Sequence, residues 1–271
     1  MIEAGEAVSF AAELTVAKQA AADAAQVLLR AATPATVREK QGAADLVTEV
    51  DEQAERLILE RLKRHFPGDR FVAEESSAGA LRHGERTWII DPLDGTTNFV
   101  HGHPFACVSI AFADTEGLAV GVVHAPFLGE VYHAVRGGGA YLNERPLQVS
   151  AVAEGPAGLY ATGFPFKAGK GDPELYFRLV ADMVASSHGV RRAGSAALDC
   201  AFVAAGRLEG YFEIGVSAWD VAGGLLLVTE AGGRVTGWPG DTEPPLQTGR
   251  VLATNGKVHG WLEEKVGRAG L

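Results

Sequence analysis

The stretch 88–99 reads WIIDPLDGTTNF and brings two carboxylates, Asp91 and Asp94, close in sequence to the hydroxyl of Thr96. The apolar run before Asp91 predicts a strand buried on both faces. Pro92 withholds a backbone donor and is expected to end that strand, and Asp94-Gly95 allows a tight turn, so both aspartates can face one point. Because Asp, Pro and Gly dominate ordinary turns, this stretch taken alone favours a plain turn. Other residues of the chain must therefore distinguish a functional site from a plain turn.

Two further acidic stretches lie far away in sequence. The segment 71–76, FVAEES, ends an apolar strand at Glu74-Glu75, although such a pair alone also fits a solvated loop. The segment 217–224, SAWDVAGG, places Asp220 in the first turn of an apolar helix. An acid there gains roughly 0.3–1 kcal/mol from the helix dipole and needs no further role. Its small and apolar neighbours nevertheless imply that Asp220 is partly buried.

Several carboxylates in one cleft require a compensating positive charge, because two like charges about 4 Å apart repel by roughly 4 kcal/mol at an effective dielectric of 20. Oxygen-rich clusters suit hard cations, and this donor set fits magnesium better than zinc. A divalent cation would let an acidic protein bind a phosphate ester and would lower the pKa of a bound water. Gly95 and Thr96, entering a short helix, would offer backbone N–H groups to an anion.

Composition limits the other possibilities. With 271 residues and 47% hydrophobic content, the chain can form one large domain or two packed halves. The net charge of -10 argues against general binding of nucleic acid or anionic membranes. No apolar run approaches the roughly 20 residues of a membrane span, and the start of the chain lacks a basic signal-peptide segment, so we expect a cytoplasmic location. Cys107 and Cys200 are expected to be buried free thiols.

The elements that must position these residues follow from periodicity and turn signals. Helices are predicted at 6–32 and 51–65, with a mobile polar loop at 40–45 between them. Strands follow at 71–73, 88–91, 106–113, 118–124, 131–135 and 140–142, and their short turns imply antiparallel pairing. Beyond 150 the pattern alternates, with strands at 158–162, 190–192, 210–214 and 251–254 and helices at 173–187, 195–205, 219–231 and from 257. The fold class is α+β: residues 1–150 form an antiparallel-sheet half with most of the candidate ligands, and residues 151–271 form a smaller α/β half with Asp220.

Several other motifs favour structural roles. His101-Gly102-His103 is better explained as a loop than as a metal site. Gly137-Gly138-Gly139 lacks the residues of a phosphate loop and fits a hairpin or bulge. Gly223 and Gly224 inside a helix indicate close packing against the acidic strand ends. Arg191-Arg192 fits either phosphate steering or a solvated pair.

The chain resembles the inositol monophosphatase family at four stretches that follow the family's order: 45–51, 74–76, 88–99 and 219–224. The last two are the specific signatures. The resemblance implies a magnesium-dependent phosphomonoesterase with a layered αβαβα fold, which is usually a homodimer and is inhibited by lithium. Two or three Mg²⁺ ions are expected.

The resemblance also implies roles for individual residues. The metal ligands would be Glu74, Asp91, the carbonyl of Leu93, Asp94 and Asp220. Glu74 and Thr96 would activate the attacking water. The substrate contacts would be Leu93, Asp94, Gly95, Thr96, Gly194, Ser195, Ala196, Glu213 and Asp220, with Glu213 holding sugar or cyclitol hydroxyls. Lys40 and Asp51 match a mobile-loop lysine and a remote acid that could support a further, weaker metal.

The resulting hypothesis is hydrolysis of a phosphate monoester, foremost myo-inositol monophosphate, by a metal-activated water without a phosphoenzyme. Ala73 and Ser195 depart from residues common in the family without removing a ligand side chain, so they leave substrate preference open. One alternative is fructose-1,6-bisphosphatase or another small-molecule phosphatase. A non-catalytic, metal-binding regulatory protein is a further alternative, which the complete ligand set disfavours.

Overall fold

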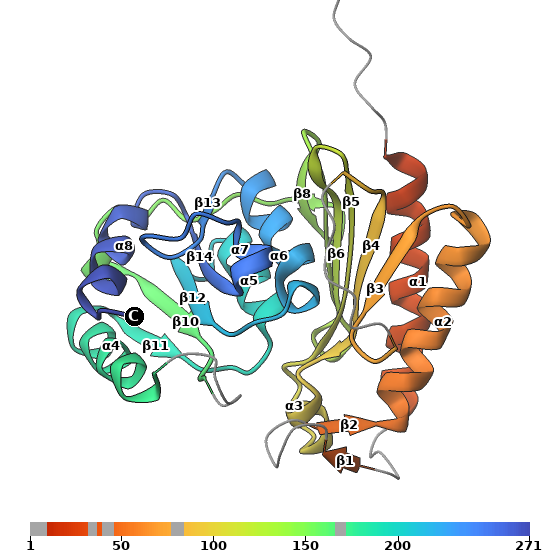
Figure 1. The fold of residues 1–271 in the computed structure, drawn as a ribbon, viewed down its shortest axis with the longest axis horizontal. Helices are drawn as coiled ribbons and strands as arrows, with labels where there is room; N and C mark the ends of the chain where they lie inside the picture. Colours follow the sequence, from red (N-terminus) through yellow and green to blue (C-terminus); the bar gives the residue numbers. More distant parts are fainter. Residues whose placement is uncertain (1–9, 32–36, 40–45, 77–83, 166–171) are drawn as a thin grey trace, which may run out of the picture.

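The computed structural model describes residues 10–31, 37–39, 46–76, 84–165 and 172–271. Five layers succeed one another across the molecule (Figure 1). Helices α1 (Ala11–Arg30) and α2 (Glu49–His65) cover the outer face of a seven-stranded sheet. Helices α5 (Ala196–Ala204) and α6 (Ala218–Glu230) lie between this sheet and a five-stranded one. Helices α4 (Pro173–Ser186) and α8 (His259–Arg268) complete the αβαβα sandwich that the resemblance implied.

The larger sheet has the order β3-β4-β5-β6-β7-β8-β9. Its strands are β3 (Arg70–Ala73), β4 (Thr87–Asp94), β5 (Cys107–Asp114), β6 (Gly117–Ala125), β7 (Glu130–Val135), β8 (Gly139–Leu142) and β9 (Arg145–Pro146). The expectation of antiparallel pairing throughout is wrong at one edge, because β3 and β4 are parallel. Their connection is long enough to return the chain to the end where β3 began. The two strands therefore end at the same edge of the sheet.

Strand β4 does not end at Pro92, as the sequence had suggested. It runs from Thr87 to Asp94, and its pairing with β5 shifts register between Asp91 and Asp94. A bulge of this kind takes residues out of the ladder, so the missing N–H of Pro92 costs no hydrogen bond there. The bulge turns the chain locally, and such re-aiming of side chains is common beside active sites.

The smaller sheet has the order β11-β10-β12-β14-β13. Its strands are β10 (Leu159–Thr162), β11 (Gly189–Arg191), β12 (Gly210–Ile214), β13 (Arg234–Thr236) and β14 (Arg250–Thr254). β10 is parallel to both β11 and β12, whereas β14 is antiparallel to β12 and β13. The short β13 was not predicted. The division of the chain at residue 150 stays a prediction.

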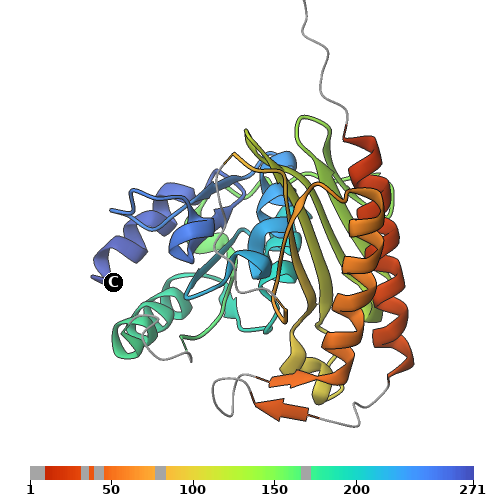
Figure 2. The same cartoon turned by 45° about the vertical axis from the view of Figure 1, so that its right-hand side comes forward.

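Short elements complete the fold. β1 (Val37–Glu39) and β2 (Leu46–Thr48), which were not predicted, pair antiparallel and lie apart from both sheets, beside α3 (Thr96–Val100) (Figure 2). The loop expected at 40–45 lies outside the described residues. The remaining turns are η1 (Pro126–Leu128), η2 (Gly155–Ala157) and α7 (Pro245–Thr248). Among the described residues, no helix combines the length and apolar character that crossing a bilayer requires.

Helix α6 packs closely in the centre of the sandwich because glycines allow it. A Cβ on Gly121 of β6 would lie 2.7 Å from the carbonyl oxygen of Gly223, and one on Gly224 would lie 2.5 Å from the Cβ of Cys200 in α5. Close packing of Gly223 and Gly224 is therefore confirmed, although their nearest neighbours belong to β5, β6 and α5 rather than to the acidic strand ends. Cys107 and Cys200 are buried free thiols, as expected.

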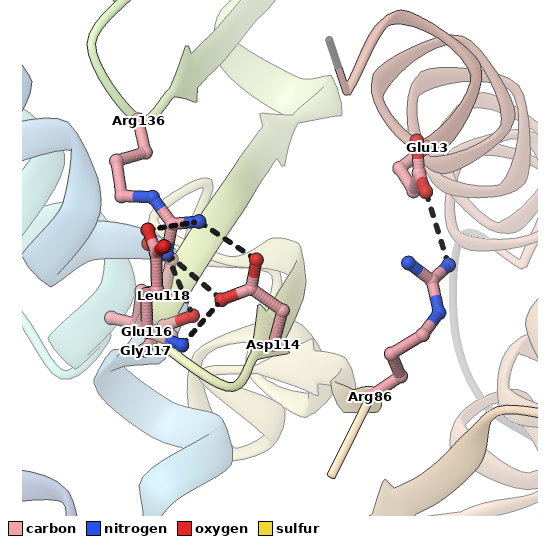
Figure 3. A network of polar contacts seen from close by, with 7 residues as sticks. All are labelled: Glu13, Arg86, Asp114, Glu116, Gly117, Leu118 and Arg136. Carbon is pink, nitrogen blue, oxygen red and sulfur yellow. Dashed lines mark hydrogen bonds and ion pairs between the residues drawn. The ribbon is translucent and has the colours of Figure 1, made fainter. Parts of the chain in front are cut away.

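Two ion pairs connect strands of the larger sheet to α1 and to each other (Figure 3). Arg86, just before β4, lies 3.0 Å from Glu13 of α1. Arg136, just after β7, lies 2.7 Å from Asp114 at the end of β5.

The loops predicted at 101–103 and 137–139 are both present: His103 N donates to Asn98 O in the turn after α3, and Gly137–Gly139 joins β7 to β8. None of these groups lines the cleft described next.

Candidate active site

A cleft of about 300 Å³ lies where β4 ends, and both halves of the chain line it. It is lined by the metal ligands, catalytic residues and substrate contacts that the family resemblance implied: Glu74, Asp91, Leu93, Asp94, Gly95, Thr96, Gly194, Ser195, Ala196, Glu213 and Asp220. Asp199 also lines it, although the sequence analysis did not single it out. Among the described lining residues, Arg192 is the one with a cationic side chain. The cleft is therefore strongly acidic.

The parallel pairing of β3 with β4 brings the first acids together. Ala73 pairs with Ile90, and Glu74 N donates to Ile90 O at 3.2 Å, so Glu74, which follows β3, lies beside Asp91 of β4. Asp91 is only 1% exposed. Its Oδ1 accepts a hydrogen bond from Leu93 N at 3.0 Å, which closes the turn that presents Leu93 and Asp94.

Asp94 is held from the other half of the chain. Its Oδ2 accepts hydrogen bonds from Ser195 Oγ at 2.7 Å and from Ala197 N at 2.8 Å, at the start of α5. Ser195 is also the N-cap of α5 and is almost fully buried. The start of this helix therefore fixes the orientation of an aspartate that the larger sheet supplies.

Burial and mutual repulsion disfavour the charged forms of these acids. Burial, followed by the charges of Glu74, Asp94 and Asp220, raises the pKa of Asp91 well above its usual range. Burial also raises the pKa of Asp94 to about 7, against the hydrogen bonds from Ser195 and Ala197. A cation that enters the cleft would therefore stabilise the ionised forms of these carboxyl groups.

Gly95 makes the turn from β4 into α3. Its φ is +96°, a region that side-chain-bearing residues rarely adopt, and a Cβ there would lie 2.9 Å from Phe105 O. The turn places Thr96 at the first position of α3. Asn98, two residues later, donates to Phe105 O at 2.7 Å and to Ala193 O at 2.8 Å, which links α3 to the loop before α5.

Thr96 is positioned by a residue that is not itself among the described lining residues of the cleft. Its Oγ1 lies 3.0 Å from Asp51 Oδ1 and 3.0 Å from Leu93 O, and it can donate to either. Asp51 is fully buried, and its Oδ2 accepts from Thr48 N and Thr48 Oγ1 at 2.8 and 2.6 Å. Burial raises the pKa of Asp51, whereas the hydrogen bonds from Thr48 and Thr96 lower it. A supporting metal role for Asp51 stays a prediction, and Lys40 lies outside the described residues.

Asp220 caps α6 as well as lining the cleft. Its Oδ2 accepts from Ser217 N at 2.6 Å in a capping box, which is the structural role that its sequence position allows. Its charge also raises the pKa of Asp91 and of Glu213. A capping role and a role in the acidic cleft are therefore compatible.

The remaining side of the cleft belongs to the smaller sheet. Glu213 of β12 accepts from Tyr211 Oη at 2.7 Å. A Cβ on Gly163 would lie only 1.9 Å from Glu213 Oε1, so the absence of a side chain at this position makes room for the carboxyl group. Burial, opposed by the Tyr211 hydrogen bond, raises the pKa of Glu213 to about 7. Gly194, with a φ of +91°, begins the approach to Ser195 and Ala196.

The donor set fits a hard divalent cation. Four carboxylates and the carbonyl of Leu93 are the oxygen ligands that Mg²⁺ prefers. In the described part of the chain, no three His, Cys, Asp or Glu side chains are gathered closely enough to form a finished metal site. A cation bound between these acids would offset their mutual repulsion.

An acidic cleft with oxygen donors, set at the edge of a layered αβαβα fold, fits the class of metal-dependent proteins that bind small anionic ligands. The sequence profile described as the inositol monophosphatase family matches residues 11–270. The chain therefore belongs to the inositol monophosphatase family, which implies phosphatase activity and, in general, dependence on metal ions.

Individual relatives agree with this placement. The chain is 46% identical to the inositol-1-monophosphatase of Synechocystis over 233 residues, which cover 84% of this chain and 79% of that protein. It is 41% identical to the Nus factor SuhB of Salmonella typhimurium over 247 residues, which cover 90% of this chain and 92% of that protein. The crystal structure of the extragenic suppressor protein suhB from Bartonella henselae superposes with a TM-score of 0.87 at 37% identity, covering 94% of this chain and 98% of that one.

Proposed function

We propose that this protein hydrolyses a phosphate monoester of a small polyol, foremost myo-inositol monophosphate, with Mg²⁺ as its cofactor. The observation that carries the proposal is the convergence of Glu74, Asp91, Asp94 and Asp220 on one cleft beside the hydroxyl of Thr96. The similarity to a relative named inositol-1-monophosphatase supports the choice of substrate.

The chain's own groups divide the work. Glu74, Asp91, Asp94, Asp220 and the carbonyl of Leu93 would hold two or three Mg²⁺ ions. When bound, these ions supply positive charge to the phosphoryl oxygens and the leaving alcohol oxygen and lower the pKa of water. The backbone N–H groups of Gly95 and Thr96 would hold the phosphate at the start of α3.

Thr96 would orient the attacking water. Because its hydroxyl proton is directed to Asp51 or to Leu93 O, its oxygen can accept a hydrogen bond from that water. Glu74 would take the proton as the water oxygen attacks phosphorus and the bond to the alcohol oxygen breaks in line. The alcohol would leave after gaining a proton from solvent. Because water is the nucleophile, no phosphoenzyme would form. Gly194, Ser195, Ala196 and Glu213 would contact the alcohol.

Substitution of Asp220 by asparagine tests the assignment. Asparagine retains an oxygen for the cap on Ser217 N but lacks the negative charge, so Asp220→Asn should lower turnover at saturating magnesium by at least about 100-fold. Asp172→Asn is a matched control, since Asp172 caps α4 through Glu174 N at 2.9 Å outside the cleft. Phosphate release from inositol 1-phosphate would be measured for both. Wild-type turnover in Asp220→Asn would overturn the assignment.

A second candidate, fructose-1,6-bisphosphatase, is favoured by Arg192. This side chain is the cation among the described lining residues, and its guanidinium lies over the ring of Phe164 at 5.5 Å. A guanidinium is well suited to a second phosphate group. The ratio of kcat/KM for inositol 1-phosphate and fructose 1,6-bisphosphate distinguishes the two activities. Magnesium-dependent phosphate release from either ester would exclude a purely regulatory protein. That alternative is suggested by the name of the SuhB relative, a Nus factor.

Three further properties form part of the proposal: a homodimer, inhibition by lithium and a cytoplasmic location. Light scattering would measure the oligomeric state of the purified chain, and phosphate release at increasing lithium concentration would measure inhibition. Fractionation of cells that produce the protein would locate it.

A further inference from the structure

Asp199 is an acidic residue that the proposed reaction leaves without a role. It lies within α5, whose sequence AALDCAFVA is otherwise apolar or small. It is only 2% exposed, yet it lines the cleft. A carboxyl group in such a helix costs free energy unless something satisfies it.

The described residues give the Asp199 carboxyl group no hydrogen-bond donor. Burial, followed by the charges of Glu213 and Asp94, raises its pKa well above the usual range, and the charge of Arg192 acts in the opposite direction. Asp199 thus borders the cleft with a carboxyl group that has no hydrogen-bond partner among the described residues.

Other acids of the cleft differ from Asp199 in this respect. Asp91 accepts from Leu93 N, Asp94 accepts from Ser195 and Ala197, and Glu213 accepts from Tyr211. Buried polar groups in folded proteins are nearly always paired, and an exception calls for an unseen partner. The leaving alcohol in the cleft would be such a partner.

We propose that Asp199 determines specificity by forming a hydrogen bond, beside Glu213, with a hydroxyl group of the leaving alcohol. The preferred leaving group is therefore a polyol with at least two hydroxyls, one for each carboxyl group. This inference rests on the proposed function and extends it to a residue with no role there.

The chemistry of a hydroxyl fits this position in either protonation state of Asp199. An ionised carboxylate needs a donor, a protonated carboxyl group is both donor and acceptor, and a hydroxyl can serve both. An aryl alcohol without further hydroxyls would leave Asp199 unpaired. Sites built to bind a hydroxyl discriminate strongly against analogues that lack it.

The test compares two esters in two variants of the full chain. Asp199→Ala removes the polar group, and Asp199→Asn retains a donor and an acceptor. Asp182→Ala on α4 is the control, because it removes an aspartate that is half exposed and lies outside the cleft. The esters are inositol 1-phosphate and 4-nitrophenyl phosphate, assayed with magnesium, and circular dichroism establishes that each variant is folded.

We expect Asp199→Ala to lower kcat/KM for inositol 1-phosphate by about 10-fold or more and that for 4-nitrophenyl phosphate by less than about 3-fold. The kcat/KM of Asp199→Asn for inositol 1-phosphate should lie between the values of Asp199→Ala and the wild type. The Asp182→Ala control should match the wild type on both esters. Equal losses on both esters, or no loss on either, would overturn the inference.

A failure of the proposed function gives a different result. In that case the wild type releases no phosphate from inositol 1-phosphate. Calorimetric binding of inositol 1-phosphate with magnesium then tests Asp199 independently of turnover. A Kd about 10-fold weaker for Asp199→Ala supports the inference, whereas an equal Kd, or no binding by either protein, overturns it.

Discussion

Replacing Asp94 by asparagine should stabilise the metal-free protein, although Asp94 is proposed as an essential ligand. Both hydrogen bonds to its side chain, from Ser195 Oγ and Ala197 N, reach the same oxygen, so the asparagine Oδ1 can accept both. The substitution then removes only a charge, and that charge is disfavoured by burial and by Glu74.

The sign and size follow from the pKa of Asp94, which is raised from 3.8 to about 7. A raised pKa means that the acid stabilises the fold below its unfolded pKa and that this stability is lost as pH rises through 7. The full shift corresponds to about 4 kcal/mol at pH 8. Because solvent reaches part of Asp94, we expect Asp94→Asn to raise the free energy of unfolding by about 1–3 kcal/mol.

Urea unfolding at pH 8 and pH 5, with EDTA or with magnesium, measures this effect. With EDTA the gain should be clearly larger at pH 8 than at pH 5, because at pH 5 the folded wild type keeps Asp94 protonated while the unfolded chain already ionises it. With magnesium the wild type should become the more stable protein, because the variant has lost a ligand.

Asp114→Asn is the control of opposite sign. Arg136, 2.7 Å away, lowers the pKa of Asp114, so its charge stabilises the fold at neutral pH and that stability is lost as pH falls through the lowered pKa (Figure 3). This variant should lose stability at pH 8 by the same amount with and without magnesium. The reasoning is refuted if Asp94→Asn is destabilised with EDTA at pH 8, or if magnesium leaves its difference from the wild type unchanged.

Two further substitutions test positioning groups. Tyr211→Phe removes the 2.7 Å hydrogen bond to Glu213 and should raise KM for inositol 1-phosphate about 3- to 10-fold with little change in kcat; a change in kcat alone would contradict this role. Gly121→Ala puts a Cβ 2.7 Å from Gly223 O and should cost about 1–3 kcal/mol in urea unfolding and lower activity by displacing α6. Gly260→Ala, with no atom within 4 Å of its Cβ, should be neutral or slightly stabilising, and equal losses in both variants would refute the packing argument.

The acidic motifs could be found from the sequence because each borders an apolar segment: two follow apolar strands, and Asp220 begins an apolar helix. The layered fold class and the family were also predicted, and the comparisons agree. The parallel direction of β3 was not, since an apolar strand pattern carries no information on direction. The prediction that the strand ends at Pro92 was wrong because a bulge accommodates a residue that a regular ladder excludes.

Other parts of the site depended on contacts that a single sequence does not reveal. Asp199 was overlooked, although an acid inside an otherwise apolar helix is itself a signal. The support of Asp94 by Ser195 joins residues about a hundred positions apart, and no local pattern links them. The alcohol side of the cleft, including Glu213, was predicted only through the family resemblance.

The hydrogen bonds from Ser195 and Ala197 to Asp94 also bear on how this molecule can be recombined. The larger sheet supplies the aspartate, and the start of α5, about a hundred residues later, supplies its donors. A chimera joined near residue 150 would combine an aspartate from one parent with donors from the other. Chimeras that preserve the hydrogen bonds to Asp94 should be active, whereas those that disrupt them should fold but lack activity. The two halves can therefore be exchanged only between parents that share this contact.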